Sequence, residues 1–394
     1  DEEDNSSHSF GVNNLIDKPN FSLFAPYFRL RENVAQIVLS KKAKKHSFSF
    51  GGEAGRTSLD SYSDFYNGDG VNYVLDTNSH SQTKVAETRY EAFVADTYEL
   101  SKKLNIEGKL RLEKSHIAQE GDNQKERDFT YLKPRIAASY KYNDKLDFNL
   151  SYERELGQLD FNDFAFQAQI LEGNNTQSNA ELRPEKADVF KAEFKKTWGK
   201  SGNLNIYALY VNIHDAVVLV PIIENSNIIG ESVGNVESAW RRGYGVNTKI
   251  PLDKLSKGLE INAEYTYRQS QIKDPFTHQN RELFYQGDNS YNINVTKNFE
   301  EKKLSLNAFF LHGERNTDYR LDSQYLWPNI NFWGLSGEYK GIKNYTISVQ
   351  YDVPNGIRVY RHRINYKTSR LDGELQSFHL RYRDISPRLQ FTIR

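Results

Sequence analysis

The feature of this sequence that most restricts its fold is an alternation of apolar and polar residues with a period of two. In the segment 145–153, each of Leu146, Phe148, Leu150 and Tyr152 is followed by a polar residue. The same alternation is found in 104–113 and 258–268. Such a pattern is typical of strands with one apolar and one polar face, and no helical stripe competes with it. The sequence therefore predicts an all-β protein.

The connections between the predicted strands fall into two classes. Short turns are expected at Asn143-Asp144, 199–202, 299–302 and 341–344. Long polar loops are expected at about 116–127, 158–185, 215–235, 270–288 and 315–330. Each short turn is followed by a strand, a long loop, a second strand and another short turn. This arrangement is typical of a transmembrane antiparallel β-barrel of the bacterial outer membrane, with short periplasmic turns and long extracellular loops.

The direction of each strand can be traced back from the end of the chain. A periplasmic C-terminus makes 387–394 run downward, 373–383 upward and 357–366 downward. In total we count about 17 candidate strands, most of them about 9–13 residues long, which suits tilted strands that cross a bilayer. A soluble sandwich or solenoid is the alternative, and no sequence repeat supports a solenoid.

Composition excludes several other classes of protein. The 394 residues contain no run of about 18 apolar residues, so helical membrane spans are not expected. The 52 basic and 52 acidic side chains balance, which argues against nucleic acid as a partner. The absence of Cys excludes disulfides, thiol catalysis and Cys-based metal sites.

No motif in the sequence predicts an enzyme. The acid pairs Asp160 with Asp163 and Asp318 with Asp322 are of the kind that solvated loops ordinarily contain. The nine His are scattered without the spacing of a metal site, and no G-x-S-x-G is present. We therefore predict no catalytic residue, no metal site and no cofactor.

The stretch "SYERELGQLDFNDF", residues 151–164, begins as a strand and continues into the long loop 158–185. It is followed by "NAELRPEKADVFKAEFKKTW". Together these stretches resemble a segment of TonB-dependent outer-membrane receptors, in which a "GQLDF" stretch, a loop and an N-x-x-L-x-P-E element occur in that order. Asn179, Leu182, Pro184 and Glu185 match that element. Further stretches match in order at 44–60, 87–113, 265–283, 318–322 and 383–394.

The resemblance implies a barrel of about 22 strands, of which this chain would supply the C-terminal portion. It also implies a plug domain and a short TonB-binding box upstream, neither of which this sequence contains. Residues 1–28 are expected to form an uncertain N-terminal strand or loop segment, and 29–394 the transmembrane barrel. Because about five strands are expected to be missing, the chain folded alone should leave an open sheet edge.

The function that the resemblance implies is energy-coupled uptake of a nutrient, namely a ferric siderophore or similar metal chelate, in a Gram-negative bacterium. Its partners would be the TonB complex in the periplasm, the nutrient, and the lipid and lipopolysaccharide of the outer membrane. The candidate ligand-binding residues, chosen from the long loops, are Phe161, Phe164, Phe166, His278, Arg281, Tyr319, Arg320 and Trp327.

The alternative function is a passive, porin-like diffusion channel of about 16–18 strands. The predicted polar inner face carries both signs of charge at Arg111, Arg135, Glu153, Glu260, Glu264 and Arg268. These residues would hydrogen-bond a plug in a receptor, and would form a weakly selective lining in a channel. A long surface loop folded back into the lumen would favour the channel, whereas an upstream plug would favour the receptor.

Overall fold

The computed structural model describes most of the chain. The described ranges are 2–6, 9–13, 20–69, 71–75, 81–121, 124–164, 167–169, 174–176, 179–225, 227–283, 289–313, 315–329, 331–354, 358–371, 373–384 and 387–394. Within these ranges, no helix is long and apolar enough to cross a membrane.

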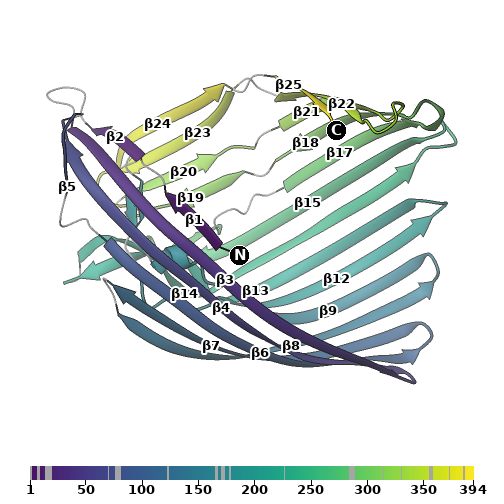
Figure 1. Cartoon of the computed structure of the whole chain (residues 1–394), viewed down its shortest axis with the longest axis horizontal. Helices are drawn as coiled ribbons and strands as arrows, with labels where there is room; N and C mark the ends of the chain where they lie inside the picture. Colours follow the sequence, from purple (N-terminus) through teal and green to yellow (C-terminus); the bar gives the residue numbers. More distant parts are fainter. Residues whose placement is uncertain are drawn as a thin grey trace.

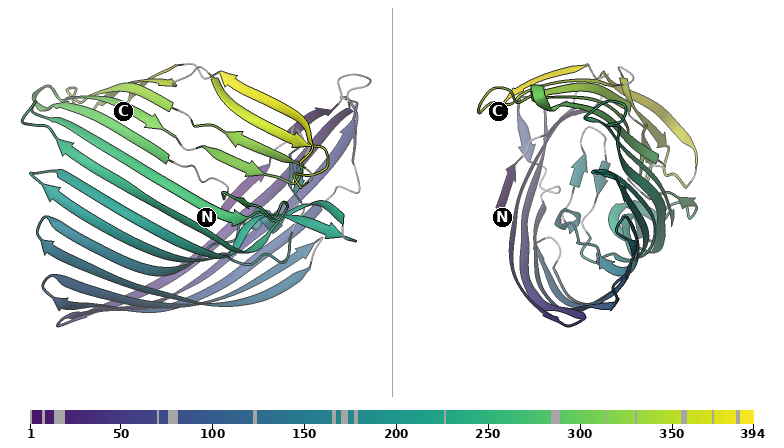
Figure 2. Two further views of the ribbon diagram at one scale, coloured as in Figure 1. Left: turned by 180° about the vertical axis from the view of Figure 1, so that it is seen from behind. Right: turned by 90° about the vertical axis from the view of Figure 1, so that its right-hand side faces the viewer.

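The architecture is one large antiparallel sheet that curves around a lumen (Figures 1 and 2). Its long strands are β3 (Asn20–Ala43), β4 (His46–Gly68), β6 (Ser81–Ser101), β7 (Leu104–Gly121), β8 (Lys125–Asn143), β9 (Leu146–Leu156), β12 (Lys186–Trp198), β13 (Gly202–Glu224), β14 (Asn227–Pro251), β15 (Leu259–Lys273), β17 (Asn289–Phe299), β18 (Leu304–His312), β21 (Asn331–Tyr339), β22 (Ile347–Pro354) and β25 (Arg388–Ile393). The short strands β1 (Glu2–Ser6), β2 (Ser9–Asn13), β5 (Tyr73–Leu75) and β16 (Asn280–Arg281) complete this 19-stranded sheet.

Two smaller sheets and two short 3-10 helices accompany the large sheet in the described part of the chain. A four-stranded sheet at one end contains β19 (Asn316–Tyr319), β20 (Ser323–Trp327), β23 (Arg358–Tyr366) and β24 (Leu375–Asp384). The hairpin of β10 (Gln167–Gln169) and β11 (Asn174–Thr176) lies inside the lumen in the end-on view of Figure 2. Two short 3-10 helices are η1 (Phe161–Phe164) and η3 (Glu300–Lys302). The predicted transmembrane β-barrel fold is confirmed, and the predicted short turns are all present.

The period-two alternation places apolar side chains on the outside of the sheet. Leu110, Leu112, Leu132 and Leu150 are between 44% and 63% exposed, and they alternate with the charged residues of the inner wall. In water, so large an exposed apolar surface would be unfavourable. In a bilayer, however, this band is matched by lipid tails, and every backbone group in the ladder is paired within the sheet.

Three of the predicted loops, 215–235, 116–127 and 315–330, are wrong, because they contain paired strands; in the last of them, β19 and β20 pair from Asn316–Trp327 to Tyr319–Gln324. In 215–235, β13 and β14 continue their ladder up to the pair Glu224–Asn227. In 116–127, β7 and β8 pair as far as Gln119–Lys125. The first segment is rich in Val and Ile, which favour strands, so pairing continues beyond the length that a membrane requires.

The predicted directions of 373–383 (upward) and 357–366 (downward), relative to a downward 387–394, are also wrong. The β23–β24 ladder pairs Arg358 with Asp384, and the β22–β25 ladder, on the other side of 355–357, pairs Asp352 with Arg388. The two ladders therefore follow one another in the same direction (Figure 1). Pro387 at this point interrupts the ladder without reversing it, because Pro removes one N–H donor.

The sheet has two free edges in the described part of the chain. β1 and β2 pair with β3 at one end, whereas β25 pairs with β22 and β24 with β23 at the other. No pairing between described residues joins the first strands to the last. The open edge that the sequence predicted is therefore present.

The assignment of faces predicts a position-dependent effect of charge. Leu150 lies about 12 Å above its periplasmic turn, near the middle of an apolar band about 25 Å tall. Leu150→Arg should lower the free energy of unfolding in lipid vesicles by about 2–4 kcal/mol. The control Ser151→Arg points into the lumen and should have a much smaller effect in the same urea titration. Equal losses would contradict the assignment.

Candidate functional site: the lumen wall, the inserted loop and the rim

The inner wall of the barrel carries charged side chains that pair with one another across strands. Arg135 lies between two carboxylates, at 2.8 Å from Glu153 and 3.1 Å from Glu107, and Arg111 lies 2.5 Å from Glu153. Glu260, further around the wall, pairs with Lys249 at 2.7 Å. The predicted mixture of charges on the inner face is thus present at these positions, and its members are partners of one another.

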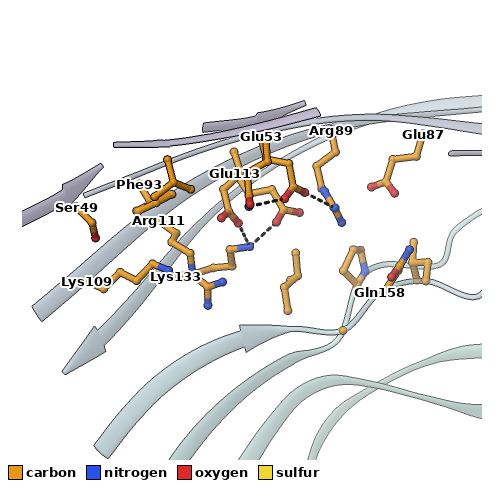
Figure 3. A pocket seen from close by; sticks show the side chains of 17 residues that line it. Ser49, Glu53, Glu87, Arg89, Phe93, Lys109, Arg111, Glu113, Lys133 and Gln158 are labelled. Carbon is orange, nitrogen blue, oxygen red and sulfur yellow. Dashed lines mark hydrogen bonds and ion pairs between the residues drawn. The ribbon is translucent and has the colours of Figure 1, made fainter. Parts of the chain in front are cut away.

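The most buried part of this network surrounds Lys133. Its ammonium group contacts the carboxylates of Glu91 and Glu113, with 2.5 Å to the latter, and its side chain is only 8% exposed. Close by, Arg89 lies 2.8 Å from Glu53 (Figure 3). Because a buried charge that loses its partner is strongly unfavourable, any molecule that enters the lumen here must replace these pairs with equivalent ones.

A cavity of about 580 Å³ separates this wall from the base of the long loop. Its wall side includes Glu53, Arg89 and Lys133, and its loop side includes Gln158 and Leu159 (Figure 3). The lining is mainly polar. The cavity can therefore hold water or a polar group, and it is unsuited to an apolar ligand.

The described residues of the loop 158–185 fold back into the lumen and pack against the wall. The loop's side chains Leu159, Phe161, Phe164 and Leu182 form a buried apolar cluster with the wall residues Leu59, Val85 and Ile117. The amide of Gln119 donates to the carbonyl of Phe164 at 3.3 Å, and the Arg127 guanidinium donates to the carbonyl of Leu182. The loop is thus attached by both apolar packing and hydrogen bonds.

This packing decides where two predicted ligand-binding residues lie. Phe161 is 5% exposed and Phe164 is fully buried, so both serve to attach the loop to the wall. Phe166 lies outside the described residues. The signal that was missed is apolar residues at inward-facing positions: Ile117 follows Glu113 and Ser115 on the same face of β7. An apolar residue on a polar lumen face indicates that something covers it.

Asp163 is an acidic residue in the part of the loop that packs against the wall. Burial, together with the nearby charge of Asp160, raises the pKa of Asp163 to about 7. Asp163 belongs to η1, between the two buried phenylalanines. The protonated carboxyl is therefore the form that favours the inserted loop.

At the extracellular rim, Asp274 is the centre of a second buried network. Its carboxylate lies 2.5 Å from Nε of Arg281 and 2.9 Å from the Arg370 guanidinium, and it accepts N–H bonds from Phe276 and Thr277. Burial by itself would raise the pKa of Asp274, but the two arginines and the N–H groups hold it below its usual range. The rim network therefore favours the ionised carboxylate of Asp274.

Further contacts extend this network to neighbouring loops. The Arg320 guanidinium lies 2.6 Å from Glu231, which also accepts the backbone N–H of Leu321 at 2.7 Å. Tyr319 lies under both Arg281 and Arg370, at 4.5 Å and 5.4 Å from its ring centre. The network joins β14, the β15–β16 turn, the β19–β20 turn and the β23–β24 turn.

The structure thus brings together three of the predicted ligand-binding residues, Arg281, Tyr319 and Arg320, but in a buried network. His278 lies in the adjacent turn with a positive φ of 58°, and Trp327 ends β20 with 39% of its surface exposed.

Sequence reasoning missed Asp274, Glu231 and Arg370. The Asp274-Pro275 pair after a strand was a usable sign of an ordered turn. Among described residues, no group of three His, Asp or Glu could hold a metal ion.

Comparisons with known proteins agree with the fold. The profile of the "Outer membrane protein beta-barrel family" matches residues 4–381. A search of curated protein sequences found no match. The structure is similar to those of the copper transporter OprC (12% identity, TM-score 0.63, covering 85% of this chain and 51% of OprC) and the unliganded ferric citrate transporter FecA (12%, 0.64, covering 100% and 58%). It is also similar to the ferric yersiniabactin uptake receptor FyuA from Yersinia pestis (12%, 0.63, covering 87% and 52%). The chain spans about half the length of these proteins.

The raised pKa of Asp163 predicts a pH-dependent loop. Because its pKa in the inserted loop is above the ordinary value of 3.8, the contribution of the neutral carboxyl is full below about pH 4 and is lost as pH rises towards 7. Hydrogen-exchange protection of 158–164, corrected for intrinsic rates, should be higher at pH 5 than at pH 8.

Asp163→Asn should make that protection independent of pH, whereas the control Asp69→Asn, in an exposed loop, should leave the dependence unchanged. Unaltered pH dependence in Asp163→Asn would show that another group is responsible.

The rim network predicts a large effect of removing its central acid. Asp274→Ala leaves Arg281 and Arg370 buried without a carboxylate, which should cost about 3–5 kcal/mol of local stability. Hydrogen exchange in 274–283 and 367–371 should accelerate accordingly. The control Glu374→Ala breaks only the exposed pair with Lys367, and should change local stability by less than about 1 kcal/mol. A similarly small effect of Asp274→Ala would contradict the role assigned to it.

Proposed function

This chain belongs to the outer membrane protein beta-barrel family, and from that membership we propose that it is the barrel of a TonB-dependent receptor of the bacterial outer membrane. Its function would be transport: the capture of a scarce nutrient outside the cell and its energy-coupled import. The cargo we propose is a ferric siderophore or a similar metal chelate. No chemical step by the barrel itself is involved.

The observation that carries this proposal is the similarity of the barrel to three proteins whose names all concern the transport or uptake of a metal or a metal complex. OprC is named for copper, FecA for ferric citrate and FyuA for ferric yersiniabactin. At 12% identity these likenesses show the fold alone, so the cargo class is our inference. The paired charges of the lumen wall support it, because ion pairs such as Arg89–Glu53 can exchange with those of a domain seated in the lumen.

Ligand capture would occur at the rim. The buried network around Asp274 holds the turns of several hairpins together, so exposed side chains near these turns can be held ready for a ligand without further ordering. His278 lies in the same turn as Asp274, and Trp327 lies at the other end of the β19–β20 hairpin from Arg320; we retain both as proposed ligand contacts. Phe161 and Phe164 are buried beneath the loop and are not proposed as contacts.

One observation favours the alternative, a passive diffusion channel. The loop 158–185 is folded into the lumen, which is the feature expected of a channel that narrows its own opening. Its apolar attachment to Leu59, Val85 and Ile117 is firm enough to form a permanent constriction. The two functions therefore have to be separated by a transport measurement.

Uptake by cells that produce the protein from its own gene, compared with a deletion strain, separates these functions. We expect uptake of one member of a panel of radiolabelled ferric chelates and copper complexes to be lost on deletion. That uptake should saturate with concentration and stop when a protonophore collapses the proton-motive force. Nonsaturating entry of small sugars and amino acids that is lost on deletion and resists the protonophore would instead establish a channel.

Trp327→Ala provides a matched test of the rim, with the lipid-facing Trp333→Ala as control. We expect the affinity for the transported complex to fall about tenfold or more only in Trp327→Ala, since a buried aromatic contact contributes on the order of 1–3 kcal/mol. Unchanged affinity would remove Trp327 from the proposed contacts.

A further inference from the structure

An apolar groove lies on the outside of the barrel, on the opposite face of the sheet from the charged wall. It has a volume of about 570 Å³ and crosses β3, β4, β6 and β7. Its outward-facing lining is Ala35, Ile37, Gly52, Ala54, Tyr90, Ala92, Leu112 and Lys114. Gln36, Glu53 and Glu91 also border it, but strand alternation directs their side chains to the lumen. Among the outward-facing lining residues, Lys114 is the only charged one.

The strand register explains the shape of the groove. Ile37, Gly52, Ala92 and Leu112 are successive partners across the four strands, and Ala35, Ala54, Tyr90 and Lys114 form the next row. Gly and Ala at the central positions keep the floor low. Tyr90 and Leu112, which are 59% and 51% exposed, rise beside it. The groove is therefore a property of side-chain sizes at fixed positions in the ladder.

Two cations stand at the extracellular end of the groove. Lys114 is part of the lining, and Arg56 lies one row further towards the loops, where its row continues through Thr88 to His116. Both Lys114 and Arg56 are exposed, and neither has a partner among the described residues. The neighbouring acid Asp128 is paired with His116 at 3.2 Å. Two positive charges are thus left available on this face.

The height of these cations corresponds to the membrane boundary. Lys114 follows the periplasmic turn at 102–103 by about eleven residues, which is about 36 Å along a strand and about 25 Å of height at a tilt of about 45°. The apolar band of an outer-membrane barrel is about 25 Å tall. Lys114 and Arg56 therefore lie where the headgroups of the outer leaflet begin, and the groove lies in the layer of acyl chains.

We propose that this groove is a binding site for a phosphate-bearing glycolipid of the outer leaflet. One acyl chain occupies the groove over Gly52 and Ala92, and a headgroup phosphate contacts Lys114 and Arg56. Charge complementarity identifies the headgroup, because cations at the membrane boundary attract anionic lipids. The extracellular position identifies the leaflet and so favours the glycolipid over an inner-leaflet phospholipid. This site is independent of the cargo and of the lumen.

The test measures lipid that remains bound to the protein purified in mild detergent from native outer membranes. Native mass spectrometry and phosphate analysis distinguish glycolipid from phospholipid. We expect bound glycolipid in the unaltered protein and a reduction of about threefold or more in Lys114→Ala/Arg56→Ala. Ala92→Phe, which fills the groove and keeps both charges, should reduce it as well.

Arg242→Ala is the matched control. Arg242 is also an outward-facing cation about ten residues from its periplasmic turn, but it stacks on Trp240 and donates to Gln269. This variant should retain its glycolipid. Equal glycolipid content in all four proteins would overturn the proposal, and so would retention of phospholipid alone. Barrel folding is verified for each variant by its resistance to unfolding in cold detergent, so that loss of lipid is not loss of structure.

Discussion

The rest of this structure depends on the need to pair every backbone N–H and C=O group within a layer that contains no water. An antiparallel sheet that curves round on itself satisfies this need everywhere except along its two free edges, with side chains alternating between lipid and lumen. The two faces of each strand thereby acquire separate functions. The outer face carries exposed leucines such as Leu112 and Leu150, and the inner face carries ion pairs such as Arg135–Glu153.

Departures from this alternation mark the places where something else is bound. On the inner face, the apolar residues Leu59, Val85 and Ile117 are covered by the loop 158–185. On the outer face, the small residues Gly52 and Ala92 form a groove that ends at Lys114. The same reasoning applies to both faces. An apolar residue on the polar inner face, or a row of small residues on the lipid-facing side, indicates that a specific partner packs there. In the first case the partner is part of the chain, and in the second we propose a lipid.

Much of the fold could be predicted from the sequence, because period-two alternation and turn residues are local signals. The turn at Asn143-Asp144 and the outward face of β9 required no knowledge of the rest of the chain. The directions of β23 and β24 were predicted wrongly, because an interrupted ladder and a hairpin turn contain similar residues. The extent of β13 and β14 was missed because pairing beyond the membrane depends on cross-strand partners far away in sequence.

The candidate site was less predictable for a physical reason. Loop residues such as Arg281, Tyr319 and Arg320 were correctly selected as a group, but their burial depends on Asp274, Glu231 and Arg370, which come from other hairpins. The sequence shows which side chains could bind a ligand. Only the packed structure shows which of them already form ion pairs or hydrogen bonds within the protein. For the same reason, the aromatic residues Phe161 and Phe164 were expected at the lip and lie against the wall.

The central claim is that the barrel serves an energy-coupled receptor whose lumen is closed until transport. It is tested most directly by the electrical conductance of the protein, isolated intact from native outer membranes, in a planar lipid bilayer. The account predicts no steady conductance above that of the bilayer alone. A stable, ohmic conductance of porin size that increases when 158–185 is deleted would contradict it, and would identify the inserted loop as the constriction of a channel.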